Sequence, residues 1–298
     1  MHNFPYLCGM KQKTAIYHLF ALFTVIVWGT TFVSTKVLLT CGLSPVGIFL
    51  YRFALAYVCL LAVARGRLLA DRWIDELLLC LAGICGGSLY FISENTALET
   101  TQASNVSLLV STSPLFTLLL TRLFYRERLP RRIFWGSCLA LAGVGMVVFA
   151  GEGVRAGRLS GDLLALLAAV VWACYCMLLK RLDTRYSTLF ITRKVFFYGI
   201  ASLALYACFF PIPTDFGLLR QPVVCLNLLF LGVLASMGCY LMWNAAVRVL
   251  GAPRTANYVY IIPLVTLLFS AIFLGEQLTP LSLAGTVCII GGVYWAAR

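Results

Sequence analysis

The sequence has few charged residues. Asp, Glu, Lys and Arg make up 11% of the 298 residues, against roughly 25% in soluble proteins. Hydrophobic residues make up 61% and the mean hydropathy is +0.93. Apolar segments are spread along the whole length, which excludes a secreted domain, a disordered chain and an enzyme held by a single anchor. We therefore predict a polytopic membrane protein.

Groups that carry out catalysis are scarce. The only two histidines, His2 and His18, lie near the N-terminus, and the sequence has no HExxH motif, no paired catalytic acids and no nucleotide-binding motif. Most of the 12 cysteines lie within or beside apolar segments without metal-site spacing, as expected for small buried hydrophobic residues. The sequence predicts neither an enzyme nor an ATP-driven pump, and no metal or cofactor.

Acidic residues are also few, 11 against 23 Lys and Arg, which gives a formal net charge of +12. An excess of this size can indicate nucleic-acid binding, but here the basic residues form short clusters between apolar segments. Basic loops of this kind orient a protein in the bilayer. We predict no nucleic-acid partner.

A helix needs about 20 apolar residues to cross about 30 Å of hydrocarbon, and ten segments of the sequence have this length. The connections between them are short, so little of the chain is left for a soluble domain. The fold predicted is all-α, with membrane helices at residues 15–38, 45–64, 77–98, 103–124, 133–150, 160–180, 188–210, 223–247, 255–273 and 280–297. The first segment is longer than the core of a signal peptide and lacks a convincing cleavage site, so we expect it to be retained.

Lys and Arg are distributed unequally between alternate connections. One side of the membrane receives Lys11, Lys13, Arg65, Arg67, Arg72, Arg126, Arg128, Arg131, Arg132, Arg181, Arg185, Arg248, Arg254 and Arg298, and the other only Arg155, Arg158 and Arg220. Since basic loops stay in the cytoplasm, both termini are predicted to be cytoplasmic in a multi-pass plasma (inner) membrane protein.

The sequence contains an internal repeat. A shift of 149 positions aligns Asn95 with Asn244, Pro114 with Pro263, Thr117 with Thr266, Glu127 with Glu276, Gly136 with Gly285 and Gly143 with Gly292. Shifts of 144 and 141 align Trp28 with Trp172, Lys36 with Lys180 and Arg52 with Arg193. The repeat divides the chain into two five-helix halves, 1–150 and 151–298. Because five is odd, the halves have opposite orientations in the membrane, the architecture of many secondary transporters.

These residues resemble a known family. The segment from Asn95 to Leu129 and its copy from Asn244 to Leu278, each with a proline followed by a glutamate, are similar to the two EamA domains of the drug/metabolite transporter superfamily. The resemblance covers nearly the whole chain. It implies ten helices with cytoplasmic ends and the export of amino acids or related small metabolites. The sequence departs from the usual pattern in placing Glu94 beside Asn95, and Arg126 where the second copy has Gly275.

Glu94 lies inside the third predicted helix. A charge at the bilayer centre costs roughly 2.5 to 3.5 kcal/mol on insertion scales, so this carboxylate should face a wet cavity or a partner. One hypothesis is that it binds substrate and couples a proton to transport; the alternative is an interfacial acid paired with Lys or Arg.

Four basic side chains could line a pore and bind a substrate carboxylate: Lys36, Arg52 and their repeat equivalents Lys180 and Arg193. Since all four lie within about two turns of a helix end, snorkelling to the headgroups is the alternative explanation, most strongly for Lys36 and Lys180. Lys36, Arg52 and Arg193 are the predicted binding residues. Trp28 precedes Lys36 by eight residues, about 80° around the helix, so both side chains could border one cavity.

Several further polar and aromatic residues are candidates for the lining of that cavity. Trp28 and Trp172 lie near mid-span, away from the interfaces where Trp usually gathers, although packing would also explain them. The other candidates are Tyr90, Asn95, Asn244, Tyr258 and Tyr260.

Pro114 and Pro263 lie near the middle of the fourth and ninth predicted helices, where each removes a backbone donor. We expect these helices to bend and predict a hinge at each proline, with static packing as the alternative. Glu127 and Glu276 precede the next helix, and a carboxylate there would stabilise its positive N-terminal end.

The leading functional hypothesis is a secondary transporter that exports a small amphiphilic metabolite, most simply an amino acid, by proton exchange. Sugar phosphates or drug-type solutes remain alternatives, as do, less favoured, a membrane enzyme and a non-transporting receptor or assembly factor. The expected partners are a small-molecule solute and the lipid bilayer. The fifth and tenth helices contain no ionisable residue and would face lipid or a second copy of the chain in a homodimer.

Overall fold

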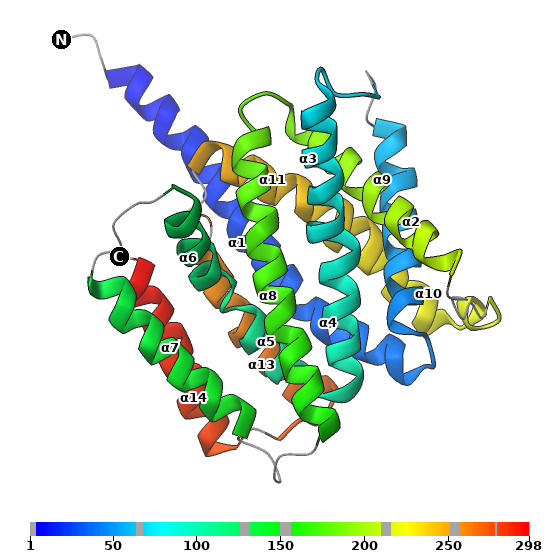
Figure 1. Ribbon diagram of the computed structural model, residues 1–298, viewed down its shortest axis with the longest axis vertical. Helices are drawn as coiled ribbons and strands as arrows, with labels where there is room; N and C mark the ends of the chain where they lie inside the picture. Colours follow the sequence, from blue (N-terminus) through cyan, green and yellow to red (C-terminus); the bar gives the residue numbers. More distant parts are fainter. Residues whose placement is uncertain are drawn as a thin grey trace.

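The computed structural model describes residues 4–63, 68–125, 131–149, 156–209, 216–250, 255, 257–277 and 279–297. Nearly all of them are helical, and the described residues include no strand (Figure 1). The elements are α1 Phe4–Thr40, α2 Pro45–Val63, α3 Trp73–Gly83, η1 Ile84–Ser88, α4 Leu89–Thr100, α5 Ala103–Val110, α6 Ser113–Tyr125, α7 Arg131–Phe149, α8 Ala156–Leu182, α9 Thr188–Ala207, η2 Leu218–Arg220, α10 Pro222–Leu229, η3 Phe230–Gly238, α11 Cys239–Leu250, η4 Asn257–Ile261, α13 Ile262–Phe273 and α14 Pro280–Ala297.

These elements form ten rods, because the third is α3–η1–α4, the fourth α5–α6, the eighth α10–η3–α11 and the ninth η4–α13. Seven of the rods are long and apolar enough to cross a membrane, and three shorter apolar helices, within α7, η4–α13 and α14, make up the ten. Each predicted segment coincides with one rod, so the predicted all-α membrane fold is confirmed. The predicted boundary between residues 150 and 151 lies outside the described residues and stays a prediction.

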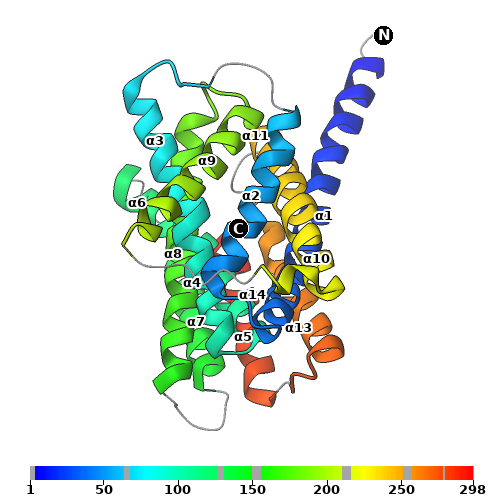
Figure 2. The ribbon, with the colours of Figure 1, turned by 90° about the vertical axis from the view of Figure 1, so that its right-hand side faces the viewer.

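Successive rods alternate in direction (Figures 1 and 2). We call the end at which α1, α3 and α9 begin the proximal end, and the end at which α1, α4 and α13 finish the distal end. The first helical turns of α1 project beyond the rest of the bundle (Figure 2). At the distal end Gly42 turns the chain with a φ of +98°, a conformation that glycine adopts without steric cost.

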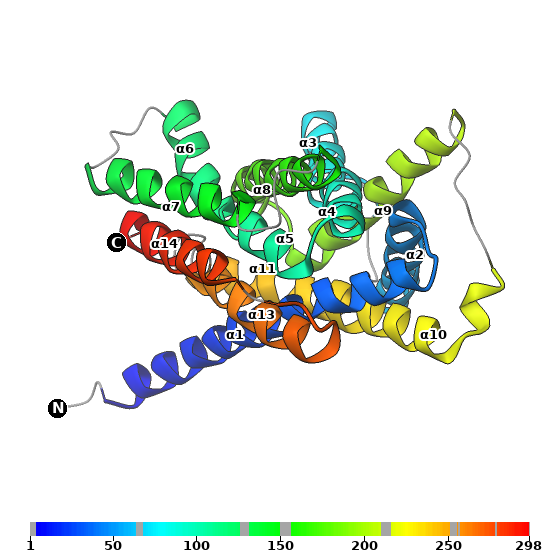
Figure 3. The same ribbon diagram turned by 90° about the horizontal axis from the view of Figure 1, so that it is seen from below.

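The rods divide into two groups that each mix the halves of the sequence. Group one contains α1, α2, α10–η3–α11 and η4–α13; group two contains α3–η1–α4, α5–α6, α8 and α9. Seen along the bundle, α1, α13 and α10 lie on one side and α6, α8 and α3 on the other (Figure 3). The repeat exchanges the two groups, because the first five rods correspond in order to the last five. An axis relating the halves must therefore pass between the groups.

The rods are interrupted at equivalent places in the two halves. The π-helix η1 of the third rod and the π-helix η3 of the eighth overlap when the sequence is shifted by 149 positions. In the fourth rod α5 ends in a turn at Ser111 and Thr112, just before Pro114, and in the ninth the 3-10 helix η4 precedes Pro263. The expected disturbance before each proline is present. Whether these breaks act as hinges stays a prediction.

The fifth and tenth rods, α7 and α14, pack along each other at one side of the two groups (Figure 1). A Cβ on Gly143 would lie 2.6 Å from the backbone oxygen of Gly285, and one on Gly292 would lie 2.6 Å from that of Gly136. The four glycines form two repeat pairs, Gly136 with Gly285 and Gly143 with Gly292. The two halves of the sequence therefore contribute equivalent glycines to the contact. Small residues here let the two backbones approach closely.

Candidate functional site

A cavity lies between the two groups. The space between its lining residues, counted together with open solvent at the mouth, is about 470 Å³. Group one contributes Trp28, Thr31, Phe32, Arg52, Tyr240, Val259 and Ile262, and group two contributes Tyr90, Phe91, Glu94, Val110, Ser113 and Trp172. Most of this surface is apolar, and its two charged side chains are Arg52 and Glu94. The cavity suits a small molecule with an apolar portion and few charges.

The lining follows the sequence repeat. Four pairs of equivalent positions contribute both members: Trp28 with Trp172, Phe91 with Tyr240, Val110 with Val259, and Ser113 with Ile262. The cavity therefore lies on the axis that relates the halves. Of these eight paired residues, the sequence predicted only Trp28 and Trp172 as lining. Three unpaired lining residues, Arg52, Tyr90 and Glu94, were also predicted. Phe91 is adjacent to the predicted Tyr90, and Tyr240 is its repeat equivalent. The sequence did not single out Phe91 or Tyr240, because neither of these two residues carries a charge or belongs to a motif.

Arg52 and Glu94 are both almost fully buried, each with 2% of its surface exposed. The Nε of Arg52 donates to the Ser236 hydroxyl at 2.6 Å, and its guanidinium carbon lies 4.3 Å from the centre of the Phe91 ring. Tyr90, one turn earlier in α4, lines the cavity together with Glu94, and Arg52 attracts the Glu94 carboxylate. These contacts hold two opposite charges against one cavity, where removing either would leave the other uncompensated.

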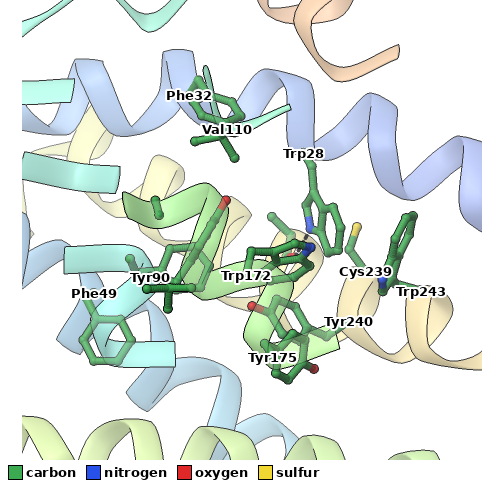
Figure 4. Packing of buried hydrophobic residues seen from close by; sticks show 14 of the residues in the cluster. Trp28, Phe32, Phe49, Tyr90, Val110, Trp172, Tyr175, Cys239, Tyr240 and Trp243 are labelled. Carbon is green, nitrogen blue, oxygen red and sulfur yellow. Dashed lines mark hydrogen bonds between the residues drawn. The ribbon is translucent and has the colours of Figure 1, made fainter. Parts of the chain in front are cut away.

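Aromatic side chains from both groups form one wall (Figure 4). The ring centroids of Trp28 and Trp172 are 5.7 Å apart in an edge-to-face arrangement, and the Trp172 ring lies 5.0 Å from those of Tyr90 and Tyr175. The Tyr240 ring lies 5.8 Å from that of Trp28. Aromatic pairs at these separations stabilise one another beyond their buried area, so the wall is a preformed apolar surface.

The two π-helices supply backbone acceptors to this wall. The Trp28 indole donates to the Ala235 carbonyl in η3 at 3.0 Å, and the Tyr240 hydroxyl donates to the Gly86 carbonyl in η1 at 2.8 Å. Gly86 and Ala235 are equivalent positions in the repeat. A π-helix shifts the register of backbone hydrogen bonds, which allows a carbonyl to accept from a side chain. In each case the donor belongs to the other half of the sequence.

Two of the predicted basic residues lie outside the cavity lining. The Lys36 ammonium donates to the backbone oxygens of Leu98 and, at 2.9 Å, Thr101, at the distal end. Arg193 is buried with its guanidinium 5.6 Å from the Phe190 ring. Of the pair Trp28 and Lys36, expected to border one cavity, only Trp28 does so.

Asn95 and Asn244 make equivalent contacts between neighbouring rods of the two groups. The Asn95 amide donates to the Pro45 carbonyl at 2.9 Å, and the Asn244 amide donates to the Thr192 hydroxyl at 3.0 Å. Neither residue lines the cavity. Both amides join the groups on the side of α2 and α9.

The two predicted tyrosines of the ninth rod also lie outside the lining. The Tyr258 hydroxyl lies 2.8 Å from Nδ1 of His18, and the buried Tyr260 hydroxyl has no hydrogen-bond partner among the described residues. Val259, between them, does line the cavity. In the equivalent rod so does Val110, whose carbonyl lies four residues before Pro114, which has no N–H to donate to it.

Contrary to the prediction, Glu276 does not stabilise the start of the helix that follows it. It does stabilise a helix N-terminus, but that of α5 in the other half: the carboxylate accepts from the backbone amides of Ala103 and Ser104 at 2.7 and 3.1 Å. The following helix, α14, is instead capped by the Thr279 hydroxyl, which accepts from the Ser282 amide at 3.1 Å. The tertiary fold places the Glu276 carboxylate at the start of α5, although α14 is the next helix in the sequence. Glu127 lies outside the described residues.

The comparison with protein families decides the class of this chain. The model of the EamA-like transporter family matches residues 15–149 and again residues 159–298. The chain belongs to the EamA-like transporter family. It is therefore a multi-pass membrane transporter of a small-molecule solute, not an enzyme, and the resemblance seen in the sequence is confirmed. The double match agrees with the repeat, one family domain to each half.

Relatives extend over nearly the whole chain. An uncharacterized transporter of Archaeoglobus fulgidus is 31% identical, covering 96% of this chain and 97% of its own length. A probable terminal-alkyne amino-acid exporter of Streptantibioticus cattleyicolor is 30% identical, covering 95% and 93%. A probable amino-acid metabolite efflux pump of Salmonella typhimurium is 27% identical, covering 92% of each chain. Two of the three names thus refer to amino-acid compounds.

A solved structure, titled only as the crystal structure of a protein, has the same fold. It superposes with a TM-score of 0.67 at 20% sequence identity, covering 95% of this chain and 96% of that chain. Within the described part of this EamA-family chain, no three His, Cys, Asp or Glu side chains gather in a way that could hold a metal ion.

Proposed function

We propose that this transporter exports amino acids or closely related zwitterionic metabolites across the plasma (inner) membrane in exchange for protons. The observation that supports the proposal is the pair of buried opposite charges, Arg52 and Glu94, on one cavity whose other walls are largely apolar. The names of two relatives point to the same class of solute. The cytoplasmic position of both termini, predicted from the basic loops, belongs to this proposal.

Recognition of the solute divides between the two charges and the aromatic wall. The guanidinium of Arg52 is positioned by Ser236 and Phe91, and a guanidinium binds a carboxylate through two parallel hydrogen bonds. Glu94 binds the ammonium group of the solute. The apolar side chain of the solute lies against Trp28 and Trp172, where water is displaced.

Proton exchange follows from two cations competing for one carboxylate. The Glu94 carboxylate binds either the solute ammonium or a proton, but not both. When the solute is released outside, a proton binds to the vacated carboxylate and is carried inward on the return step. Tyr90, one turn earlier in α4 and also in the cavity lining, orients the carboxylate in both steps. Alternate binding of solute and proton couples the two flows without a nucleotide or a metal ion.

Sugar phosphates are the second candidate, and one observation disfavours them. A phosphate dianion would be better matched by several cations, yet of Lys36, Arg52 and Arg193 only Arg52 lines the cavity. Glu94 would repel such a solute. An amino acid, with one negative and one positive group, matches the charges present.

The proposal is tested by measuring uptake of labelled amino acids and sugar phosphates into liposomes that contain the protein, with and without a pH gradient. We expect gradient-stimulated flux of at least one amino acid. Arg52→Gln should weaken its binding by roughly tenfold or more, since hydrogen bonds to a charged group contribute about 1.5 to 3 kcal/mol. The matched control is Arg193→Gln, which changes the equivalent arginine of the other half.

Purity and thermal unfolding of each variant must match the wild type, because a buried charge left without its partner destabilises a fold. Flux of sugar phosphates alone, or equal loss of binding in the Arg52 and Arg193 variants, would contradict the proposal. The homodimer through the outer faces of α7 and α14, and hinge motion at Pro114 and Pro263, remain predictions of the same account.

A further inference from the structure

The distal end of the bundle contains polar contacts that join the two groups. On one side the ammonium of Lys36, on α1 of group one, donates to the carbonyls of Leu98 and Thr101, at the end of α4 in group two. On the other side Glu276, which follows α13 of group one, accepts from group two at the start of α5. Its third bond, from the Ser104 hydroxyl, is 2.7 Å long. We call these two sets of bonds the distal clasp.

The distal clasp acts on one short segment from two sides. Lys36 holds the carbonyl end of α4, Glu276 holds the amide end of α5, and only Thr101 and Gln102 separate these helices. Each charge meets the end of a helix that attracts it, a cation at the C-terminus and an anion at the N-terminus. The two side chains also attract each other. The clasp thus secures the connection between the third and fourth rods, both of which line the cavity.

The corresponding contacts at the proximal end differ. At the distal end α1 packs against α4 and α5. Within the described residues their repeat equivalents, α8 with α11 and α8 with η4–α13, pack less closely. The Trp172 and Tyr240 rings of α8 and α11 still lie 6.1 Å apart near mid-bundle, and Arg248 attracts Asp183. Lys180, the equivalent of Lys36, is exposed, whereas Lys36 is half-buried. In an inverted repeat, such a difference between equivalent contacts is what distinguishes a closed end from an open one.

We propose that Lys36 and Glu276 form a gate that holds the distal end of the transporter closed. Breaking these bonds allows α4 and α5 to separate from α1 and α13, which opens the cavity distally while α8 closes on α11 at the other end. This inference rests on the proposed function only in requiring that the two ends open in turn; it does not depend on which solute is carried.

The test is hydrogen–deuterium exchange, followed by mass spectrometry, of the full-length protein in lipid nanodiscs without solute. The variants Lys36→Met and Glu276→Gln each remove one charge of the clasp and keep a side chain of similar length. We expect both to raise backbone exchange in residues 101–107 by roughly tenfold, the change produced by losing one charge-assisted hydrogen bond. The matched control is Glu99→Gln, which removes an exposed carboxylate that also attracts Lys36 but accepts none of the clasp's hydrogen bonds, so exchange should change far less than in the clasp variants.

Two features of the result separate a gate from a local helix cap. Lys36 bonds only carbonyls, so faster exchange at the Ala103 and Ser104 amides in Lys36→Met requires that the whole contact opens. In addition, residues 176–182 and 244–250 should exchange more slowly as the proximal end closes. The conservative variants Lys36→Arg and Glu276→Asp should behave as the wild type.

Faster exchange confined to Glu276→Gln, or no slowing at the proximal end, would show a local cap and overturn the proposal. So would conservative variants that exchange like Lys36→Met. Because no solute is present, these outcomes are distinct from failure of the transport assay.

Discussion

Residues at equivalent positions of the repeat have diverged in what they contribute. Arg52 lines the cavity while its equivalent Arg193 lies against Phe190, and the position equivalent to Glu94 is Trp243. The lining is therefore symmetric in its apolar part and asymmetric in its charges. A zwitterion has two unlike charged ends, and it therefore fits a site with unlike charges better than it would fit a site whose charges were symmetric.

Asp183 offers a test of the structure at the level of one titrating group. It lies just past the end of α8, outside the membrane-spanning segment, and burial raises the pKa of its carboxyl to about 6 although Arg248 opposes the shift. In the unfolded chain the pKa of an Asp is about 3.9. The folded state therefore binds more protons between about pH 4 and pH 6, and stability is lost as the pH rises through that window.

Asp183→Asn removes the free-energy cost of keeping a buried carboxylate ionised at high pH. We expect the variant to unfold at a temperature a few degrees higher than the wild type at pH 8 in detergent, with the difference shrinking as the pH is lowered to about 4.5. The measurement is thermal unfolding of both proteins at several pH values. A difference that does not change with pH would contradict the assigned burial of the carboxyl.

At the scale of elements, the ten rods could be predicted from the sequence because the bilayer sets the length of an apolar helix. Their interruptions were partly predictable: Pro114 and Pro263 indicate breaks in the fourth and ninth rods, but nothing local marks the π-helices η1 and η3. Two of their carbonyls, those of Ala235 and Gly86, accept hydrogen bonds from Trp28 and Tyr240, which are distant in sequence. Such contacts follow from the tertiary fold and not from local propensity.

The pair α7 and α14 gives a prediction about packing. In Gly143→Ala the new methyl group would meet the Gly285 backbone, which cannot move as a side chain can, so we expect a loss of about 1 to 3 kcal/mol in stability. The control is Gly145→Ala on the same helix, where nothing lies within 4 Å of the added Cβ. That change should be neutral or slightly stabilising, since Ala favours a helix more than Gly.

Thermal unfolding of the two alanine variants in the same detergent measures this difference. Equal effects of the two substitutions would mean that α7 and α14 do not pack through these glycines.

At the scale of the whole molecule, the repeat carries most of the information about the site. It pairs Trp28 with Trp172, both of which were predicted to line the cavity and do so, and it pairs Tyr240 with Phe91, which the sequence did not mark. It could not place Lys36, because a helical position gives the direction of a long side chain but not the carbonyls that its ammonium reaches. The polar partners of a long side chain that reaches across the groups are thus the least predictable from sequence.

We propose that the cavity between the two groups exchanges solute for protons through Glu94. The most direct test records solute exit and proton entry in the same liposomes. For the wild type we predict proton entry in fixed proportion to amino-acid exit. Glu94→Gln, which cannot titrate, should lose the proton flux and the response to a pH gradient. If Glu94→Gln folds as the wild type does and its amino-acid flux still responds fully to the gradient, the claim is wrong.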